Sequence, residues 1–301
     1  MTRTAVVTGG GGFLGANILA QAESEWSLHA IDQNPPALER GNLAWHVLDL
    51  QEAGALRDLL LDLKPHLVVH TAALSDIDFC EANPGAAEAV NVKVTLQIAE
   101  LCRRVGARLV FFSSDSVFDG RKERYRETDR PQPLNQYART KVRAEEAIAS
   151  MLADHVIIRP SLIMGLPVAQ SGNSFLWRLV QSLRSGARSA FPASEFRTPV
   201  DVITLSLATW EIAQAGFTGL LHLAGNDRLS RFDIARRIAV ALGYPAELIV
   251  DKEPVVEHGR ARRPADASLD NTRAKSLLKT PMRDFDDALR LVIQNRGNRQ
   301  L

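Results

Sequence analysis

Short apolar runs alternate with longer stretches that carry apolar residues at helical spacing along the first half of the chain. The short runs cover residues 4–8, 28–31, 43–49, 66–70, 108–112 and 156–159. The longer stretches cover residues 13–20, 51–63, 84–105 and 137–152. Because parallel strands need helical crossovers that cover both faces of their sheet, this alternation predicts an α/β fold with a doubly wound parallel sheet.

In the second half of the chain, strand-like and helix-like runs no longer alternate regularly. Helices are predicted over residues 173–186, 201–214, 231–242 and 284–294. A strand at 219–224 is a candidate to rejoin the main sheet. We therefore predict a first domain over residues 1–160 and a smaller C-terminal lobe over residues 161–301. The polar stretch from Asp251 to Asp266 is predicted to be a surface loop.

Four consecutive glycines, Gly9 to Gly12, separate the first predicted strand from the first predicted helix. With Gly15 they form the spacing Gly9-x-x-Gly12-x-x-Gly15. A strand that ends in glycine and leads into a helix presents free backbone N–H groups and the positive end of the helix dipole, which suits a diphosphate. Glycine runs also occur in turns and linkers, but this strand-before, helix-after context predicts a Rossmann-type dinucleotide-binding domain over residues 1–160.

The second predicted strand ends in Asp32, 17 residues beyond Gly15. An acidic residue at this place accepts the hydroxyls of an adenosine ribose and repels a 2′-phosphate. No Arg or Lys follows until Arg40, so NAD is favoured and NADP stays open as the alternative. Asp32 also begins a turn-rich stretch, which is an independent structural reason for an aspartate there.

Composition narrows the function classes. The 301 residues are 46% hydrophobic and 24% charged with a net charge of +1, which favours neither nucleic acid nor an anionic membrane surface as a partner. No apolar stretch approaches the roughly 20 residues that span a bilayer, and we expect a cytoplasmic protein. Cys80 and Cys102 lie in separate segments and the seven histidines show no paired spacing, so no metal site is expected.

A polar cluster follows the fifth predicted strand, where ligands of such sheets bind. It contains Ser113, Ser114 and Asp115, and further along the chain Tyr137 and Lys141 share one face of a predicted helix. A lysine charge held close to a tyrosine lowers the pKa of the phenol, and a serine hydroxyl can hydrogen-bond a substrate oxygen. Such groups can protonate a carbonyl oxygen while a nicotinamide delivers hydride to its carbon.

Each of these features also has an ordinary structural interpretation. A Tyr four residues before a Lys is common by chance on helices, and adjacent serines often cap a helix or form a turn. The combination with the glycine-rich turn is far more specific than its parts.

Gly9-x-x-Gly12-x-x-Gly15, Ser114 and Tyr137-x-x-x-Lys141, in this order, resemble the extended short-chain dehydrogenase/reductase superfamily. Within it, the segment from Ser113 to Gly120 resembles the Ser-Thr-Asp-Tyr-Val-Phe-Asp-Gly segment of the dTDP-4-dehydrorhamnose reductase group. The order of Tyr125-Arg126-Glu127, Pro133-Leu134-Asn135 and Tyr137 to Lys141 is also similar to that group. The resemblance is strong over residues 1–165 and thin afterwards, where Arg263-Pro264 and Leu269-Asp270 echo the C-terminal segment of the group.

The resemblance implies roles for individual residues. Tyr137 would be the general acid, Lys141 would also bind the nicotinamide ribose, and Ser114 would keep the hydroxyl of the family's threonine. The implied cofactor-binding residues are Gly9, Gly12, Phe13, Leu14, Gly15, Asp32, Asp49, Leu50, Thr71, Ala72, Ala73, Tyr137 and Lys141. Among them, Asp49 and Leu50 would border the adenine. The related dehydratases carry an Asp-Glu pair after the catalytic threonine, whereas Ser116 follows Asp115 here, so dehydration is disfavoured.

Residues 161–301 would form the substrate-binding lobe. Asp115, Arg197 and Arg263 are the candidate substrate contacts, and an arginine such as Arg197 or Arg263 could hold a substrate phosphate. Arginines in loops are more often simply solvated, which is the competing interpretation.

The leading functional hypothesis is an NAD(P)-dependent reductase of a keto group on a sugar, a nucleotide-activated 4-keto-6-deoxysugar in particular. One alternative is an NAD-retaining sugar-nucleotide 4-epimerase, which uses the same three groups. Another is a non-catalytic dinucleotide-binding regulatory subunit, since the regulatory subunit of methionine adenosyltransferase is similar to these reductases. We expect a small-molecule sugar substrate, no nucleic-acid or membrane partner, and leave a homodimer open.

Overall fold

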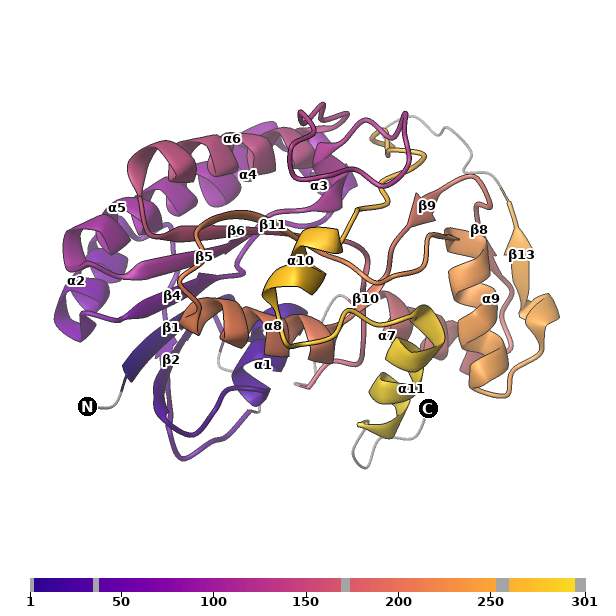
Figure 1. Cartoon of the computed structure of the whole chain (residues 1–301), viewed down its shortest axis with the longest axis horizontal. Coiled ribbons are helices and arrows are strands. Elements are labelled where there is room, and N and C mark those ends of the chain that lie inside the picture. Colours follow the sequence, from indigo (N-terminus) through magenta and orange to yellow (C-terminus); the bar gives the residue numbers. More distant parts are fainter. Residues whose placement is uncertain (1–2, 35–37, 169–173, 253–259, 296–301) are drawn as a thin grey trace.

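A parallel seven-stranded sheet forms the centre of the larger half of the molecule (Figure 1). The computed structural model describes residues 3–34, 38–168, 174–252 and 260–295. In spatial order the strands are β11 (Gly219–Leu223), β6 (His155–Pro160), β5 (Arg108–Phe112), β4 (Leu67–His70), β1 (Arg3–Thr8), β2 (Trp26–Asp32) and β3 (Leu43–Val47). The strand order reverses between β1 and β4, so the predicted doubly wound α/β fold is confirmed.

Helices cover both faces of the sheet, because the strands are apolar on both sides (Figure 1). One face is covered by α2 (Ala53–Leu63), α3 (Ile77–Ala82), α4 (Pro84–Glu88), α5 (Thr95–Val105) and α6 (Gln136–Met151). The other is covered by α1 (Phe13–Ala20), α8 (Val202–Gln214) and α10 (Thr272–Leu277). Leu56 and Ile98 are fully buried on the first face, and Ile18 and Leu205 on the second. Complete burial of one such side chain stabilises the fold by about 1.5–3 kcal/mol.

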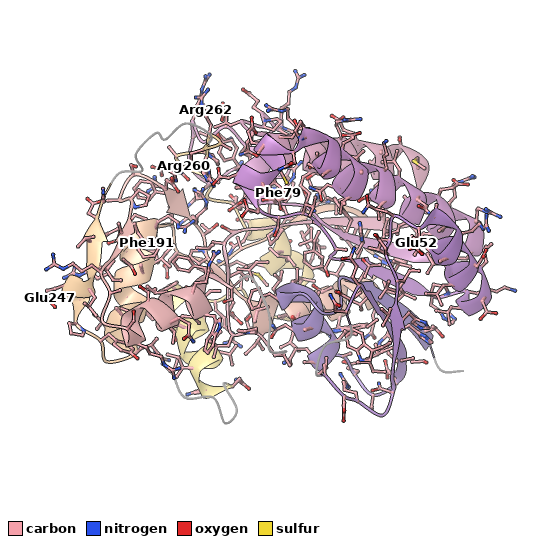
Figure 2. All side chains as sticks on the ribbon, turned by 180° about the vertical axis from the view of Figure 1, so that it is seen from behind. Glu52, Phe79, Phe191, Glu247, Arg260 and Arg262 are labelled. Atoms are coloured by element: carbon pink, nitrogen blue, oxygen red, sulfur yellow. The ribbon has the colours of Figure 1, made fainter. Side chains whose placement is uncertain are left out.

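The smaller lobe has its own apolar core between three helices. These are α7 (Phe175–Arg184), α9 (Arg231–Ala241) and α11 (Phe285–Gln294). Short paired strands connect them: β7 (Ile163–Met164) with β10 (Val200–Asp201), β8 (Ser189–Phe191) with β13 (Ile249–Asp251), and β9 (Phe196–Arg197) with β12 (Leu229–Ser230). Figure 2 shows Phe191 and Glu247 on this lobe and Glu52 at the far end of the first half.

The chain crosses between the halves more than once. The strand expected at 219–224 is β11, which pairs in parallel with β6 at one edge of the main sheet. Helix α8, which also follows residue 161, packs its buried Trp210 against Trp26 of β2 at a ring-centroid distance of 5.5 Å. The sheet of the first half therefore includes elements from the second.

The helices differ from the expectation in two places. The predicted helix over 84–105 is interrupted by a π-helical turn, η1 (Ala89–Val94), which separates α4 from α5. The six-residue helices α3 and α10 were not predicted, because they are too short to show a helical period of apolar residues.

None of the helices in the described part of the chain combines the length and the apolarity that a bilayer crossing requires.

The stretch from Asp251 to Asp266 is not simply a surface loop. Residues 253–259 of it lie outside the described residues. Ala261 and Asp266 are buried, and Asn135 Nδ2 donates to the Arg262 carbonyl oxygen at 2.8 Å. The prediction was wrong for this final part, because polar composition does not distinguish a solvated segment from one whose polar groups are bonded inside the molecule.

Candidate active site

A cleft of about 1130 Å³ lies at the carboxyl ends of the strands, between the first half and the lobe. Every residue that the sequence singles out as catalytic, cofactor-binding or substrate-binding lines this cleft. Ligands of open α/β sheets bind at this edge, next to the point where the strand order reverses.

The glycine-rich turn forms one end of the cleft. Gly9 has a φ of +69°, and a Cβ placed there would lie 2.8 Å from the backbone of Ala72. A Cβ on Gly15 would overlap the Gly9 carbonyl oxygen, so these two positions require glycine. Helix α1 begins after Gly12, which has no side chain to cap it. The backbone N–H groups of its first turn are thus available to an anion, and the turn fits the diphosphate of a dinucleotide.

Asp32 lies beside this turn at the end of β2. Its Oδ2 accepts from the Gly11 N–H at 2.9 Å and its Oδ1 from the Asn34 N–H at 3.3 Å. Asp32 therefore both supports the turn and presents its carboxylate to the cleft. Arg40 is the next basic residue along the chain, and its guanidinium instead donates to the Leu19 and Ala22 carbonyl oxygens. This arrangement fits a ribose with a free 2′-hydroxyl.

The π-helical turn η1 connects the loop after β4 to helix α6. It directs the buried Asn91 inward, where Oδ1 accepts from the Leu74 N–H at 2.8 Å. Asn91 Nδ2 donates to the Leu74 carbonyl oxygen at 3.0 Å and to Thr140 Oγ1 at 3.1 Å. The loop after β4 is thereby fixed to α6. The sequence analysis did not single out Asn91. The only sign in the sequence was a side-chain amide among the apolar residues of a predicted helix.

Ser114, Tyr137 and Lys141 come from two segments and meet in the middle of the cleft. Ser114 follows β5 and caps the short helix η2 (Asp115–Val117), where its Oγ accepts from the Ser116 N–H at 3.1 Å. Tyr137 and Lys141 are one turn apart on α6 and both are buried. Lys141 Nζ donates to the Phe112 carbonyl oxygen at 2.9 Å and lies 5.8 Å from the centroid of the Tyr137 ring.

Protonation in this cluster differs from the expectation. Burial raises the pKa of Tyr137, whereas a hydrogen bond with Ser114 opposes that rise and the Asp115 carboxylate adds to it. Burial also lowers the pKa of Lys141 to about 8. The predicted lowering of the phenol pKa was therefore wrong for this structure, because desolvation of the buried ring favours the neutral phenol. The raised pKa favours the neutral phenol, which is the form that donates a proton.

A buried ion pair lies next to the candidate catalytic residues Ser114, Tyr137 and Lys141. Arg159 of β6 donates from Nε to Glu145 Oε1 at 2.9 Å and from Nη2 to Glu145 Oε2 at 2.5 Å. Ser113 Oγ donates to the same carboxylate. Glu145 lies one turn after Lys141 on α6, and its charge raises the pKa of Lys141 against the effect of burial. Sequence reasoning missed Glu145 and Arg159, although Tyr137, Lys141 and Glu145 repeat at four-residue intervals.

The predicted substrate contacts lie on the lobe side of the cleft, and each forms an ion pair within the protein. Arg197 Nε is 3.6 Å from Asp115 Oδ2, and both side chains are buried. Burial raises the pKa of the Asp115 carboxyl, and Arg197 opposes the rise. Arg263 donates to both carboxylate oxygens of Asp78 at 2.7 Å, which links the C-terminal segment to α3. Three further arginines that the sequence did not single out, Arg178, Arg231 and Arg260, also line this side.

The parallel sheet, the glycine-rich turn and the cleft that holds Ser114, Tyr137 and Lys141 define the fold of an extended short-chain dehydrogenase/reductase. A family model described as the RmlD substrate binding domain matches residues 3–297. The chain belongs to this family.

Comparison with individual proteins gives both relatives and structural neighbours. The chain is 30% identical over 292 residues to methionine adenosyltransferase 2 subunit beta of Bos taurus, covering 93% of this chain and 85% of that protein. It is 27% identical to the Haloferax volcanii protein named "Probable low-salt glycan biosynthesis reductase Agl14", covering 95% of each.

Among solved structures, dTDP-4-dehydrorhamnose reductase from Bacillus anthracis in complex with NADP matches with a TM-score of 0.86 at 22% identity, covering 98% of this chain and 99% of that one. The dTDP-4-dehydrorhamnose reductase from Yersinia enterocolitica matches with a TM-score of 0.83 at 27% identity, covering 97% and 99%.

Proposed function

We propose that the chain is an NAD(P)-dependent oxidoreductase that reduces a keto group of a nucleotide-activated sugar, a 4-keto-6-deoxysugar in particular. The observation that carries this proposal is the meeting of Ser114, Tyr137 and Lys141 in the same cleft as the uncapped N-terminus of α1. The cleft volume of about 1130 Å³ exceeds the usual range for a single small ligand, which suits a dinucleotide and a sugar side by side.

The three side chains divide the work of proton transfer. Tyr137, held protonated by burial, donates its proton to the carbonyl oxygen of the substrate. Ser114 hydrogen-bonds that same oxygen as negative charge develops on it. The Lys141 ammonium stabilises the phenolate that remains after the proton has left. A reduced nicotinamide dinucleotide, when bound at the glycine-rich turn, supplies the hydride.

Two of the similar proteins support a reductase. The Yersinia enterocolitica structure is a dTDP-4-dehydrorhamnose reductase, and the Haloferax volcanii relative carries the name of a reductase. The Bacillus anthracis structure holds NADP, whereas the position of Asp32 favours NAD in this chain. We take NAD as the preferred cofactor and NADP as the alternative.

The test is an absorbance assay of NADH and NADPH oxidation with dTDP-, UDP- and GDP-linked 4-keto sugars. We expect consumption of reduced cofactor that matches the amount of alcohol formed. Cofactor that stays bound through purification, with no net consumption, would instead identify a 4-epimerase.

The methionine adenosyltransferase relatives provide the one observation that favours a regulatory role. A pull-down that recovers a stoichiometric protein partner, together with no oxidation of NADH or NADPH across the sugar panel, would establish that role. A cytoplasmic location, a homodimer and a domain division at residue 160 stay predictions.

A further inference from the structure

Tyr137 lies in the first turn of α6, and two side chains cap this turn. The helix begins at Gln136, so the backbone N–H groups of the first turn have no acceptor within the helix. Asn135 Oδ1 accepts from the Ala138 N–H at 2.9 Å. Glu81 Oε2, which comes from α3, accepts from the Gln136 N–H at 2.6 Å. The position of Tyr137 therefore depends on Asn135 and Glu81.

Helix α3 also lies against the phenol ring. Its residue Cys80 is fully buried and belongs to the same apolar cluster as Tyr137 and Ala87. Cys80 Sγ donates to the carbonyl oxygen of Leu74, in the loop after β4, at 3.3 Å. Because α3 contacts both the backbone before Tyr137 and its ring, a shift of α3 would change the position of the phenol.

A short part of the C-terminal half, residues 260–263, is bonded to both of these supports, and we call it the connecting segment. Asn135 Nδ2 donates at 2.8 Å to the carbonyl oxygen of Arg262, which Figure 2 labels. On α3, Asp78 accepts two hydrogen bonds from the Arg263 guanidinium at 2.7 Å. A backbone N–H of the segment donates to the same carboxylate at 2.8 Å. The segment thus holds the first turn of α6 by two independent routes.

The connecting segment is also bonded to the lobe. Arg260 Nη2 lies 3.7 Å from Glu195 Oε1. Directly after the segment, the Ala265 carbonyl oxygen accepts from the N–H of Phe196, in β9, at 2.7 Å. The phenol of Tyr137 is therefore placed relative to the lobe as well as relative to the sheet.

We propose that the connecting segment positions Tyr137 for proton transfer, with Asp78 and Asn135 as the two positioning residues. A general acid has to lie within hydrogen-bond reach of the oxygen that it protonates, and a misplacement of about 1 Å can cost about 100-fold in rate. By joining the lobe to the first turn of α6, the segment sets the distance between the phenol and a substrate bound against the lobe. This inference rests on the proposed function, because the proton transfer is a step of the proposed reduction.

The experiment compares two conservative variants. Asp78→Asn keeps the size of the side chain but loses the charge of the ion pair, and Asn135→Ser keeps a helix-capping oxygen but loses the amide donor. In each we expect kcat for reduction of the 4-keto sugar to fall about tenfold, while the Kd for NADH stays within about twofold. Glu88→Gln is the matched control, because it breaks an ion pair with Arg143 beyond the first turn of α6 and should leave kcat unchanged.

A second measurement separates positioning from a general weakening of the structure. In the Tyr137→Phe background no phenol proton remains to be misplaced. Asp78→Asn should therefore lower the residual turnover of that variant by less than about twofold. Equal losses in both backgrounds would show that Asp78 only supports the structure, and would overturn the proposal.

Hydrogen exchange tests the same contacts without turnover or ligand. In both clamp-weakening variants, Asp78→Asn and Asn135→Ser, the first turn of α6 is held less firmly. The amides of Gln136 and Ala138 should therefore exchange about tenfold faster than in the wild type. The Glu88→Gln control should exchange at the wild-type rate at both amides.

The proposal is overturned if both variants keep the wild-type kcat, or if the two amides exchange at the wild-type rate in both. If Asn135→Ser does not fold, Asp78→Asn decides alone, since the Asp78 side chain is 45% exposed. A wild type that reduces no keto sugar would remove the reductase assignment, and the exchange rates would still decide whether the segment holds this turn. Conversely, reduction by the wild type with unchanged kcat in both variants would remove this inference and leave the reductase assignment intact.

Discussion

The two sides of the cleft differ in how their buried polar groups are satisfied. On the first half, His70 bridges Thr8 Oγ1 at 2.7 Å and Thr95 Oγ1 at 3.0 Å, and the carboxylate of Glu145 is shared by Ser113 and Arg159. On the lobe, by contrast, Arg231 is half-buried beside the Phe175 ring, and its buried Nε has no hydrogen-bond partner among the described residues.

This difference separates the two tasks of the site. In this network only Arg159 Nη1 lacks a partner, and hydrogen bonds among the other members hold the neighbouring groups at fixed positions before any ligand arrives. A polar group that has no hydrogen-bond partner in the protein can be completed by a ligand, and it therefore favours ligands that carry a matching group. We infer that the first half holds the chemistry and that the lobe selects the substrate.

The largest effect should come from Tyr137→Phe, which removes only the proton donor. We expect kcat to fall about 10³-fold or more while the Kd for NADH stays within a few-fold. Tyr244→Phe is the matched control, because Tyr244 packs in the lobe core and does not line the cleft. Equal losses of turnover and of NADH affinity in Tyr137→Phe would show that the tyrosine is structural.

Gly15→Ala should break the cofactor end of the cleft. Its Cβ would overlap the Gly9 carbonyl oxygen, so the turn has to shift, and we expect NADH affinity to fall on the order of 100-fold. Gly54→Ala on α2 meets no atom within 4 Å and should instead stabilise the protein by about 0.5–1 kcal/mol. Calorimetry of NADH binding and thermal unfolding of both variants provide the measurement. Wild-type NADH affinity in Gly15→Ala would argue against a dinucleotide at this turn.

Glu145→Gln should move the pH dependence of catalysis. Burial lowers the pKa of Lys141 to about 8 even though the charge of Glu145 raises it. Without that charge Lys141 loses its proton at lower pH, so the alkaline limb of the profile of kcat/KM against pH should shift toward neutral pH by about one unit, as expected for the loss of a nearby opposite charge. Glu146→Gln, at an exposed position of the same helix, should leave the profile unchanged. An unshifted alkaline limb in a folded Glu145→Gln variant would contradict the role assigned to Glu145.

The smallest effect concerns the choice between NAD and NADP. Asp32→Ala removes the carboxylate that would repel a 2′-phosphate, and the ratio of NAD to NADP affinity should fall about tenfold. Because Asp32 also accepts from the Gly11 N–H, Asp32→Asn is the companion variant that keeps a hydrogen-bond acceptor without the charge. An unchanged ratio in both variants would mean that Asp32 acts only in the turn.

The fold of the first half and the arrangement of its catalytic groups could be predicted because the signals are local. Buried parallel strands are short apolar runs, and their order along the chain places their ends at one edge of the sheet. Helical spacing alone puts Tyr137 and Lys141 on one face. Their roles in catalysis nevertheless stay a proposal until turnover is measured.

The features of the site that could not be predicted from the sequence depend on tertiary contacts. Glu145 and Arg159 are 14 residues apart and meet only because α6 packs on β6. The direction of the Tyr137 pKa shift depends on how deeply the ring is buried, which no local pattern records. Likewise, nothing in the sequence separates Arg231 from Arg197 or Arg263, since the difference is whether a carboxylate oxygen lies within ion-pair distance of the guanidinium.

Because β11 pairs with β6, the first 160 residues do not contain the whole central sheet. A fragment that stops at residue 160 would lack both the outermost strand and α8, leaving β6 with a bare row of amide and carbonyl groups. Such an edge invites association with other copies, and the uncovered apolar face beneath α8 adds to that tendency. The cofactor-binding half is therefore expected to aggregate when produced alone and to melt together with the lobe in a single transition in the intact chain.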